Sequence, residues 1–374
     1  MRIGIVTIVD YNNYGNRLQN FALQKLLENA GNDVTTIRNF TNTARKSESQ
    51  MEKLIKAGIK FLVSSSGRKK IVKKIKLRKY NELRANNFNK FTKNYIKESK
   101  FLIDEKTEDF TFDNQFDCYV IGSDQVWNYN FPRFSNLDFV NYSSKSKISY
   151  AASFGVKDIP NRYIDFYKDG LEKIDFLSVR EESGKDIIKD IAKRESKVVL
   201  DPTLLLEKKE WLKLIKGKEI IEKRYILTYF LDTPLSKDSQ YIKDYAKKNN
   251  LGIKQLATQS DLEGWVADPV EFINLFSQAE YVFTDSFHAS VFSIIFEREF
   301  EVFSRNYDGP SMNSRLDTLL DILNLSDRWH NTNERKDKIN YEDVYNLLNK
   351  ERENSFNFLN QSLKLVEEES NKKR

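Results

Sequence analysis

The chain has 374 residues, of which 40% are apolar and 31% are charged, so it is long enough for two hydrophobic cores and too apolar to remain disordered. Its formal net charge is +6, from 61 basic and 55 acidic residues, a balance too even to indicate nucleic-acid binding. The small positive excess instead favours sites that hold anionic small molecules.

The first half alternates strand-length apolar runs with helical patterns, which is typical of βαβ units with parallel strands. The strands are predicted at residues 2–8, 34–37, 118–121, 147–150, 176–179 and 198–200, and the helices at 16–29 and 181–192. A lysine-rich stretch at about 50–100 has apolar residues at helical spacing, which predicts an exposed basic helical insertion.

A second series repeats this pattern, with strands predicted at 225–230, 252–256 and 280–284 and helices at 236–249, 269–278 and 287–296. Asp268 precedes Pro269, a typical cap and first residue of a helix. A charged helix is expected from about Asn340, fraying after Glu367. We therefore predict an α/β fold with two Rossmann-like domains facing a cleft, over 1–205 and 206–335, followed by a C-terminal helix and frayed tail over 336–374.

Ligands of such folds bind where the strands end at their carboxyl termini, so the loops there are the first places to search. The loop after the first strand is unusually polar, and its Asn13, Asn16 and Arg17 are candidates for contacting an acceptor. Gly15 permits a tight turn, Asn16 can cap the following helix, and the first free amides can receive an anion or a sugar oxygen. The alternative interpretation makes these residues turn and cap residues only, with Arg17 solvated.

A second loop, at 122–128, places carboxylate, carboxamide and indole groups close together, a mixture that suits a sugar. Gln125, Trp127 and Asn128 are candidates for acceptor contacts, and Asp124 can also deprotonate a hydroxyl group. The structural alternative makes Ser123 and Asp124 a turn and puts the Trp127 ring in the core.

Arg180 lies at a third strand-to-helix junction, where its guanidinium can form two parallel hydrogen bonds to a carboxylate or phosphate. A salt bridge to Glu181 or Glu182 is the alternative. The residue is therefore a candidate for binding an anionic donor.

The segment 284–290 ends a strand and begins an apolar helix that carries one of the two histidines of the chain. Asp285 or Ser286 can cap this helix, and the backbone N–H groups of its first turn can donate hydrogen bonds to an anion. His288 can act as a general acid or stabilise a leaving phosphate, because imidazole titrates near neutral pH. A structural histidine that bonds a backbone carbonyl is the alternative.

Two further arginines, Arg305 and Arg315, follow the next strand and begin a helix, where they can complete an anion pocket or be ordinary surface charges. His330 receives no predicted role. Cys118 is the single cysteine, so the sequence predicts no intramolecular disulfide. The two histidines are far apart in sequence, so no metal site is predicted, although binding of a loosely held Mg²⁺ stays an open alternative.

No Walker loop or complete dinucleotide fingerprint is present, so we expect no required cofactor.

The N-terminus has the pattern of a strand and lacks that of a signal peptide, and no apolar stretch approaches the roughly 20 residues of a membrane helix. A cytoplasmic protein is expected. The basic stretch at 50–100 is either a solvated helix surface or a peripheral contact with an anionic membrane at its inner face, and the sequence gives no oligomeric state.

Seven segments, in order, resemble the polysaccharide pyruvyl transferase family over roughly residues 2–325: DYNNYGNRLQNFALQ, FDCYVIGSDQVWN, ISYAASFG, LSVREESG, VVLDPTLLL, AEYVFTDSFHASVFSIIF and NSRLDTLL. The resemblance implies a fold like that of GT-B glycosyltransferases. It also implies phosphoenolpyruvate as the donor and formation of a pyruvyl ketal on a glycan or lipid-linked saccharide, with release of phosphate.

The resemblance also implies roles for single residues. The donor's anionic groups would lie near Arg180 and the turn at 286–288, with His288 as the foremost catalytic residue and Asp124 as the group that orients or deprotonates the acceptor. Some members carry Arg-Leu-His where this chain has Ser-Phe-His at 286–288, so either Arg305 or Arg315 would replace the absent guanidinium, or the donor would bind differently. Two alternatives stay open: a GT-B-like glycosyltransferase that uses a nucleotide sugar, and a catalytically silent glycan-binding protein.

Overall fold

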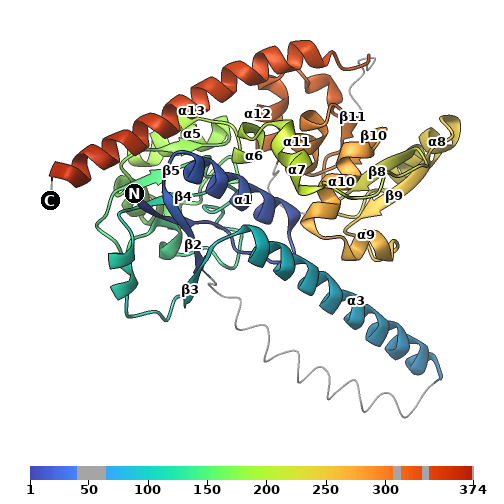
Figure 1. The fold of residues 1–374 in the computed structure, drawn as a ribbon, viewed down its shortest axis with the longest axis horizontal. Coiled ribbons are helices and arrows are strands. Elements are labelled where there is room, and N and C mark those ends of the chain that lie inside the picture. The colour runs from blue at the N-terminus through green and yellow to red at the C-terminus, as the bar shows by residue number, and fades with distance from the viewer. Residues whose placement is uncertain (40–64, 306–312, 331–336, 373–374) are drawn as a thin grey trace.

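The structure, a computed structural model, describes residues 1–39, 65–305, 313–330 and 337–372. Figure 1 shows two α/β halves side by side, with a long C-terminal helix running over both and a second long helix, α3, running along the opposite side. Among the described residues, no helix is both long enough and apolar enough to cross a bilayer.

The first half is built on a parallel sheet that has five strands in the described residues, in the order β3-β2-β1-β4-β5. These strands are β1 (Arg2–Val6), β2 (Asp33–Asn39), β3 (Glu98–Ile103), β4 (Cys118–Ile121) and β5 (Lys147–Ser149). The short parallel pair β6 (Ser178–Val179) and β7 (Lys197–Val198) continues this sheet through single bridges from Ile148 to Phe176 and from Ala152 to Val179.

Its helices in the described residues are α1 (Tyr14–Asn29), α3 (Ser65–Tyr95), α4 (Ile164–Glu172), α5 (Glu182–Ala192), α6 (Pro202–Leu205) and α7 (Lys208–Leu214). Short 3-10 turns lie at Thr111–Gln115, Asn136–Phe139 and Asn161–Tyr163. The β1 strand is buried from its second residue onward, as the apolar run predicted.

The second half has a parallel sheet that contains four strands in the described residues, in the order β11-β10-β8-β9. Its strands are β8 (Tyr225–Tyr229), β9 (Gly252–Leu256), β10 (Tyr281–Thr284) and β11 (Glu299–Val302). Its helices are α8 (Ser236–Lys248), α9 (Leu262–Val266), α10 (Pro269–Gln278), α11 (Phe287–Ile295) and α12 (Ser314–Ile322), followed by a 3-10 turn at Ser326–Arg328 and by α13 (Tyr341–Lys372). The prediction of an α/β fold with two Rossmann-like units is confirmed; the residue limits given for the domains stay a prediction.

One hydrophobic core spans both halves. Tyr14 of α1 stacks on Phe272 of α10, with 4.7 Å between ring centroids, and also contacts Phe88 of α3 and Tyr229 of β8. The Tyr14 hydroxyl donates to the Ala267 carbonyl of the second half at 2.8 Å. Because aromatic rings bury much apolar area, this contact joins the halves through α1.

Three sequence predictions need correction. Residues 98–103 form the edge strand β3, so the basic helix ends at Tyr95 and not near residue 100. That helix is also not wholly exposed, because Phe88 and Phe91 are buried in the shared core. The segment predicted to fray continues α13 as far as Lys372. The part of the insertion at 50–64 lies outside the described residues.

Candidate functional site

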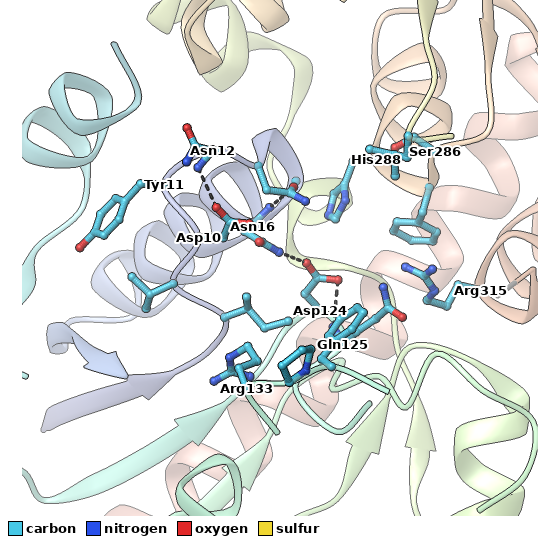
Figure 2. A pocket seen from close by; sticks show the side chains of 18 of the residues that line it. Asp10, Tyr11, Asn12, Asn16, Asp124, Gln125, Arg133, Ser286, His288 and Arg315 are labelled. Carbon is cyan, nitrogen blue, oxygen red and sulfur yellow. Dashed lines mark hydrogen bonds between the residues drawn. The ribbon is translucent and has the colours of Figure 1, made fainter. Parts of the chain in front are cut away.

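A cleft of about 680 Å³ lies between the two halves, where strands of both sheets end at their carboxyl termini. Its lining comes from the loops and helix starts that follow β1, β4, β8, β10 and β11, and from Asn39 at the end of β2. This is where ligands of parallel α/β sheets bind. Figure 2 shows Ser286, His288 and Arg315 across the cleft from Asn12.

The start of α1 forms one wall. Asn13 caps the helix, and its side chain accepts a hydrogen bond from the backbone N–H of Asn16 at 3.2 Å. Asn16 was predicted as the cap but lies in the first turn, where its side-chain N–H donates to the Asp124 carboxylate. Gly15 packs against the His288 ring: a Cβ there would lie 2.2 Å from Nδ1. A side chain at position 15 would therefore displace His288.

A buried chain of opposite charges lies behind the cleft. Arg180 donates through Nη2 to Asp124 Oδ1 at 3.0 Å and through Nη1 to Asp201 Oδ2 at 2.6 Å. Its guanidinium also lies over the Phe287 ring, 4.3 Å from the centroid. Both oxygens of the Asp124 carboxylate accept hydrogen bonds, one from Asn16 and the other from Arg180 and the Gln125 N–H.

This charge chain keeps both carboxylates ionised. Burial alone would raise the pKa of Asp124, but the positive charges of Arg180, His288 and Arg315 outweigh it and hold that pKa below its usual value. Burial alone would also raise the pKa of Asp201. That pKa is nevertheless held far below the ordinary range by His288, by Arg180 and by a hydrogen bond from Thr203. An ionised Asp124 whose oxygens already accept hydrogen bonds is better suited to orienting neighbours than to removing a proton.

His288 lies at the second position of α11, where the predicted cap is confirmed because Ser286 accepts from the backbone N–H of Ala289. It is 7% exposed and lines the cleft. Its Nε2 lies 3.6 Å from Asp201 Oδ2, an ion-pair distance when the ring is protonated but too long for a hydrogen bond. The ring of the second half thus faces a carboxylate of the first.

Three guanidinium groups complete the lining: Arg133, Arg305 and Arg315. Arg315 is buried, and this burial, together with the charges of Arg180 and Arg305, lowers its pKa to about 9. Arg305 donates to the Asp285 carbonyl at 3.4 Å, and Arg133 pairs with the Asp138 carboxylate at 2.6 Å. An anion in the cleft would relieve the mutual repulsion of these cations.

The structure brings most of the sequence candidates together in this cleft: Asn13, Asn16, Asp124, Gln125, Ser286, His288, Arg305 and Arg315. Four candidates lie elsewhere. Arg17 is fully buried and pairs with Glu98 at 3.2 Å, so the alternative of a solvated Arg17 is wrong, and we no longer assign the residue its predicted acceptor contact. Arg180 is not part of the lining, and its guanidinium pairs with the Asp124 and Asp201 carboxylates, so its contact with the donor stays a prediction.

Trp127 and Asn128 also lie away from the cleft. The Trp127 ring is fully buried and stacks on Phe139 at 5.5 Å, as the structural alternative proposed. Asn128 is fully buried and donates to the Gln125 side chain at 2.8 Å. Both residues therefore support the loop that carries Asp124, and their predicted contacts with an acceptor are corrected.

The sequence interpretation missed Asp201, Arg133 and Tyr229. Asp201 was given no role in the sequence analysis; it is the cap of α6 and accepts from the Thr203 N–H at 3.0 Å. Its position just after β7, at the carboxyl end of a strand, was the available signal. Arg133 lies in a loop without a motif, and Tyr229 ends a strand that was interpreted as core.

Comparison with known proteins adds a family match. The model of the family described as polysaccharide pyruvyl transferase matches residues 13–307. A search of curated proteins found no match. Among solved structures, a UDP-GlcNAc 2-epimerase from Methanocaldococcus jannaschii has 10% identity and a TM-score of 0.47, covering 93% of this chain and 92% of that one. An ADP-heptose lps heptosyltransferase II from E. coli has 8% identity and a TM-score of 0.36, covering 94% of this chain and 99% of that one.

Proposed function

Because the chain belongs to the polysaccharide pyruvyl transferase family, we propose that it transfers a pyruvyl group from phosphoenolpyruvate to two hydroxyl groups of a saccharide. The products are a pyruvyl ketal and inorganic phosphate. The observation that carries the proposal is that His288 and Arg315 line the same cleft between the halves, with His288 at the capped start of α11.

The donor carries a carboxylate and a phosphate, and both need cationic or N–H partners. Arg315 and Arg305 supply guanidinium groups, and the first turn of α11 presents backbone N–H groups beside Ser286. We infer that these residues, from the second half, bind the donor. Arg305 and Arg315 thereby replace the arginine that some family members carry at the position of Ser286.

The reaction begins when a proton is added to the methylene carbon of phosphoenolpyruvate, which leaves a cationic centre at the neighbouring carbon. One saccharide hydroxyl attacks that carbon and loses its proton. The C–O bond to phosphate then breaks, and the second hydroxyl attacks the same carbon and loses its proton to close the ketal. Of the two protons released, one replaces the proton added to the methylene carbon and the other leaves on the phosphate.

His288 is the residue we assign to proton transfer or to the leaving phosphate, because it is the histidine that lines the cleft. An imidazolium at this position would lie 3.6 Å from the Asp201 carboxylate. On the opposite wall, Asn13, Gln125 and Asp124 offer amide and carboxylate groups for saccharide hydroxyls. The acceptor is therefore assigned to the first half.

The donor class is tested by incubating the protein with a pool of bacterial saccharides and either phosphoenolpyruvate or a panel of nucleotide sugars. We expect release of phosphate that depends on both phosphoenolpyruvate and saccharide, and no release of nucleotide. Release of nucleotide would instead identify a glycosyltransferase, and binding of saccharide without turnover of any donor would identify a glycan-binding protein.

His288→Ala tests the catalytic assignment in the same assay. Turnover should fall on the order of 10²-fold or more, because the proton-transfer group is lost. His330→Ala is the matched control: His330 bonds Glu301 at 2.9 Å on the second sheet and does not line the cleft. Near-normal turnover in a folded His288→Ala protein would exclude His288 as the catalytic group.

A further inference from the structure

A second cavity of about 460 Å³ adjoins the cleft, between α3 and the second half. Asn12, Asn13, Tyr229 and Leu231 line both cavities, so the two cavities are neighbours that share these residues. We call the second cavity the side groove. In Figure 2, Asn12, where the side groove begins, lies across the cleft from Arg315.

Trp265 of α9 provides the aromatic surface of the side groove. The side chain is partly buried, and its Nε1 donates to Asn81 Oδ1 of α3 at 2.9 Å, which fixes the orientation of the ring. Asn81 and Asn12, both exposed, add carboxamide groups beside the ring. The Arg84 guanidinium lies over one face of the indole, 5.0 Å from the ring centroid. The second face, with the neighbouring carboxamides, suits a sugar ring, which has an apolar face and hydroxyl edges.

The charge of the side groove differs from that of the cleft. Its described lining contains no carboxylate and no lysine, and its cation is Arg84. That guanidinium is buried and donates to the Tyr14 hydroxyl at 3.0 Å, to the Trp265 carbonyl at 2.5 Å and to the Asn12 carbonyl at 2.8 Å. Arg84 therefore holds the walls together, and the groove favours a neutral ligand over a second anion.

We propose that the side groove binds further sugar units of the acceptor, so that the substrate is a saccharide of at least two units. The unit that receives the pyruvyl group lies in the cleft, and the next neutral unit stacks on Trp265. This proposal rests on the proposed function for the identity of the first unit. Binding to the groove itself needs no donor and no turnover.

The test uses an array of defined neutral bacterial glycans, in which each monosaccharide is matched by di-, tri- and tetrasaccharides that contain it. Binding is measured without phosphoenolpyruvate. For at least one series, the wild type should bind the longer glycans at least tenfold more tightly than the monosaccharide. The Trp265→Ala variant should bind the longer glycans no more tightly than the monosaccharide, and its affinity for the monosaccharide should equal that of the wild type. Asn81→Ala, on an exposed residue that cannot disturb the core, should reduce the gain in the same direction.

Trp329→Ala is the control, because it removes another partly buried tryptophan that lines neither cavity. An array without any gain from added units would overturn the proposal, and so would a gain that survives both groove variants. The proposed reaction fails separately, when glycans bind through Trp265 but phosphate is never released from phosphoenolpyruvate.

Discussion

Replacing Asp201 with asparagine is expected to lower kcat on the order of 10²-fold and to leave KM for phosphoenolpyruvate nearly unchanged. The Asp201 carboxylate lies 3.6 Å from His288 Nε2 and is not part of the cleft lining, so it acts on the histidine and not on the donor. The phosphate-release assay measures both constants.

Ser123→Ala is the control for that variant, because Ser123 donates to the same carboxylate at 3.0 Å and its loss leaves the charge in place. Thermal unfolding should show that both variants fold. A rise in KM with unchanged kcat in Asp201→Asn would mean that Asp201 helps to bind the donor and does not position His288.

Asp124 gives a prediction for stability against pH. Burial raises its pKa, but Arg180, His288 and Arg315 outweigh burial and hold the pKa below the ordinary value of 3.8. The ionised carboxylate therefore stabilises the fold above that value, and this contribution is lost as pH falls through the lower folded-state pKa. Urea unfolding should show that the wild type loses stability more steeply than Asp124→Asn as pH falls below 3.8.

Asp169→Asn provides the baseline, because Asp169 is an exposed partner of Lys173 at 2.7 Å. Its pH dependence should match that of the wild type. Equal slopes in the wild type and in Asp124→Asn would show that the buried charge chain does not stabilise Asp124 as an anion.

At this scale, the sequence predicted positions better than roles. Asn16, Asp124 and His288 could be placed in the cleft because polar residues that follow parallel strands meet at one sheet edge. Arg180 follows a strand by the same rule, yet it points into a buried charge chain with Asp124 and Asp201. Hydrophobic periodicity and turn residues do not reveal which charged side chains pair across distant segments. The partners of Arg180 could therefore be identified only from the structure.

Among the elements, α13 supports the charge chain from outside the cleft. Ser355 is fully buried in α13, and its hydroxyl accepts from the Leu200 N–H at 3.0 Å, one residue before Asp201. Ser355→Ala should cost about 1–3 kcal/mol of unfolding free energy, because the buried N–H loses its acceptor. It should also lower kcat, since the backbone that carries Asp201 is released.

Asn354→Ala is the matched change on the exposed face of the same helix and should alter stability by no more than about 0.5 kcal/mol. Urea unfolding and the phosphate-release assay give the two readouts. Loss of stability in Ser355→Ala with unchanged kcat would separate α13 from the site.

Most elements could be predicted because their apolar periods are strong, as in β4 and α10, whose bounds agree with the sequence analysis. The strand β3 was missed because it follows a long basic helical pattern and lies at the sheet edge, where its burial is incomplete and leaves little alternation to detect. The role of α3 was missed for a related reason. Arg84 has the same charge as its exposed neighbours, but it is buried against the second half.

For the whole molecule, the shared core predicts one cooperative unfolding transition, although the described residues of the two halves form separate sheets. Tyr14, Phe88 and Phe272 come from both halves and pack in one cluster, so each half loses part of its core when the other unfolds. Differential scanning calorimetry should record a single peak. Two resolved peaks would mean that the halves fold independently and that α1 and α3 only link them.

The proposed reaction depends on where a small molecule with two anionic groups lies between the halves. A crystal structure of the protein soaked with phosphoenolpyruvate tests this most directly. We predict density in the cleft, with the phosphate and carboxylate bonded to Arg315, Arg305 and the first turn of α11 and with the methylene carbon near His288. Density for phosphoenolpyruvate away from these residues, or an empty cleft at saturating donor, would contradict it.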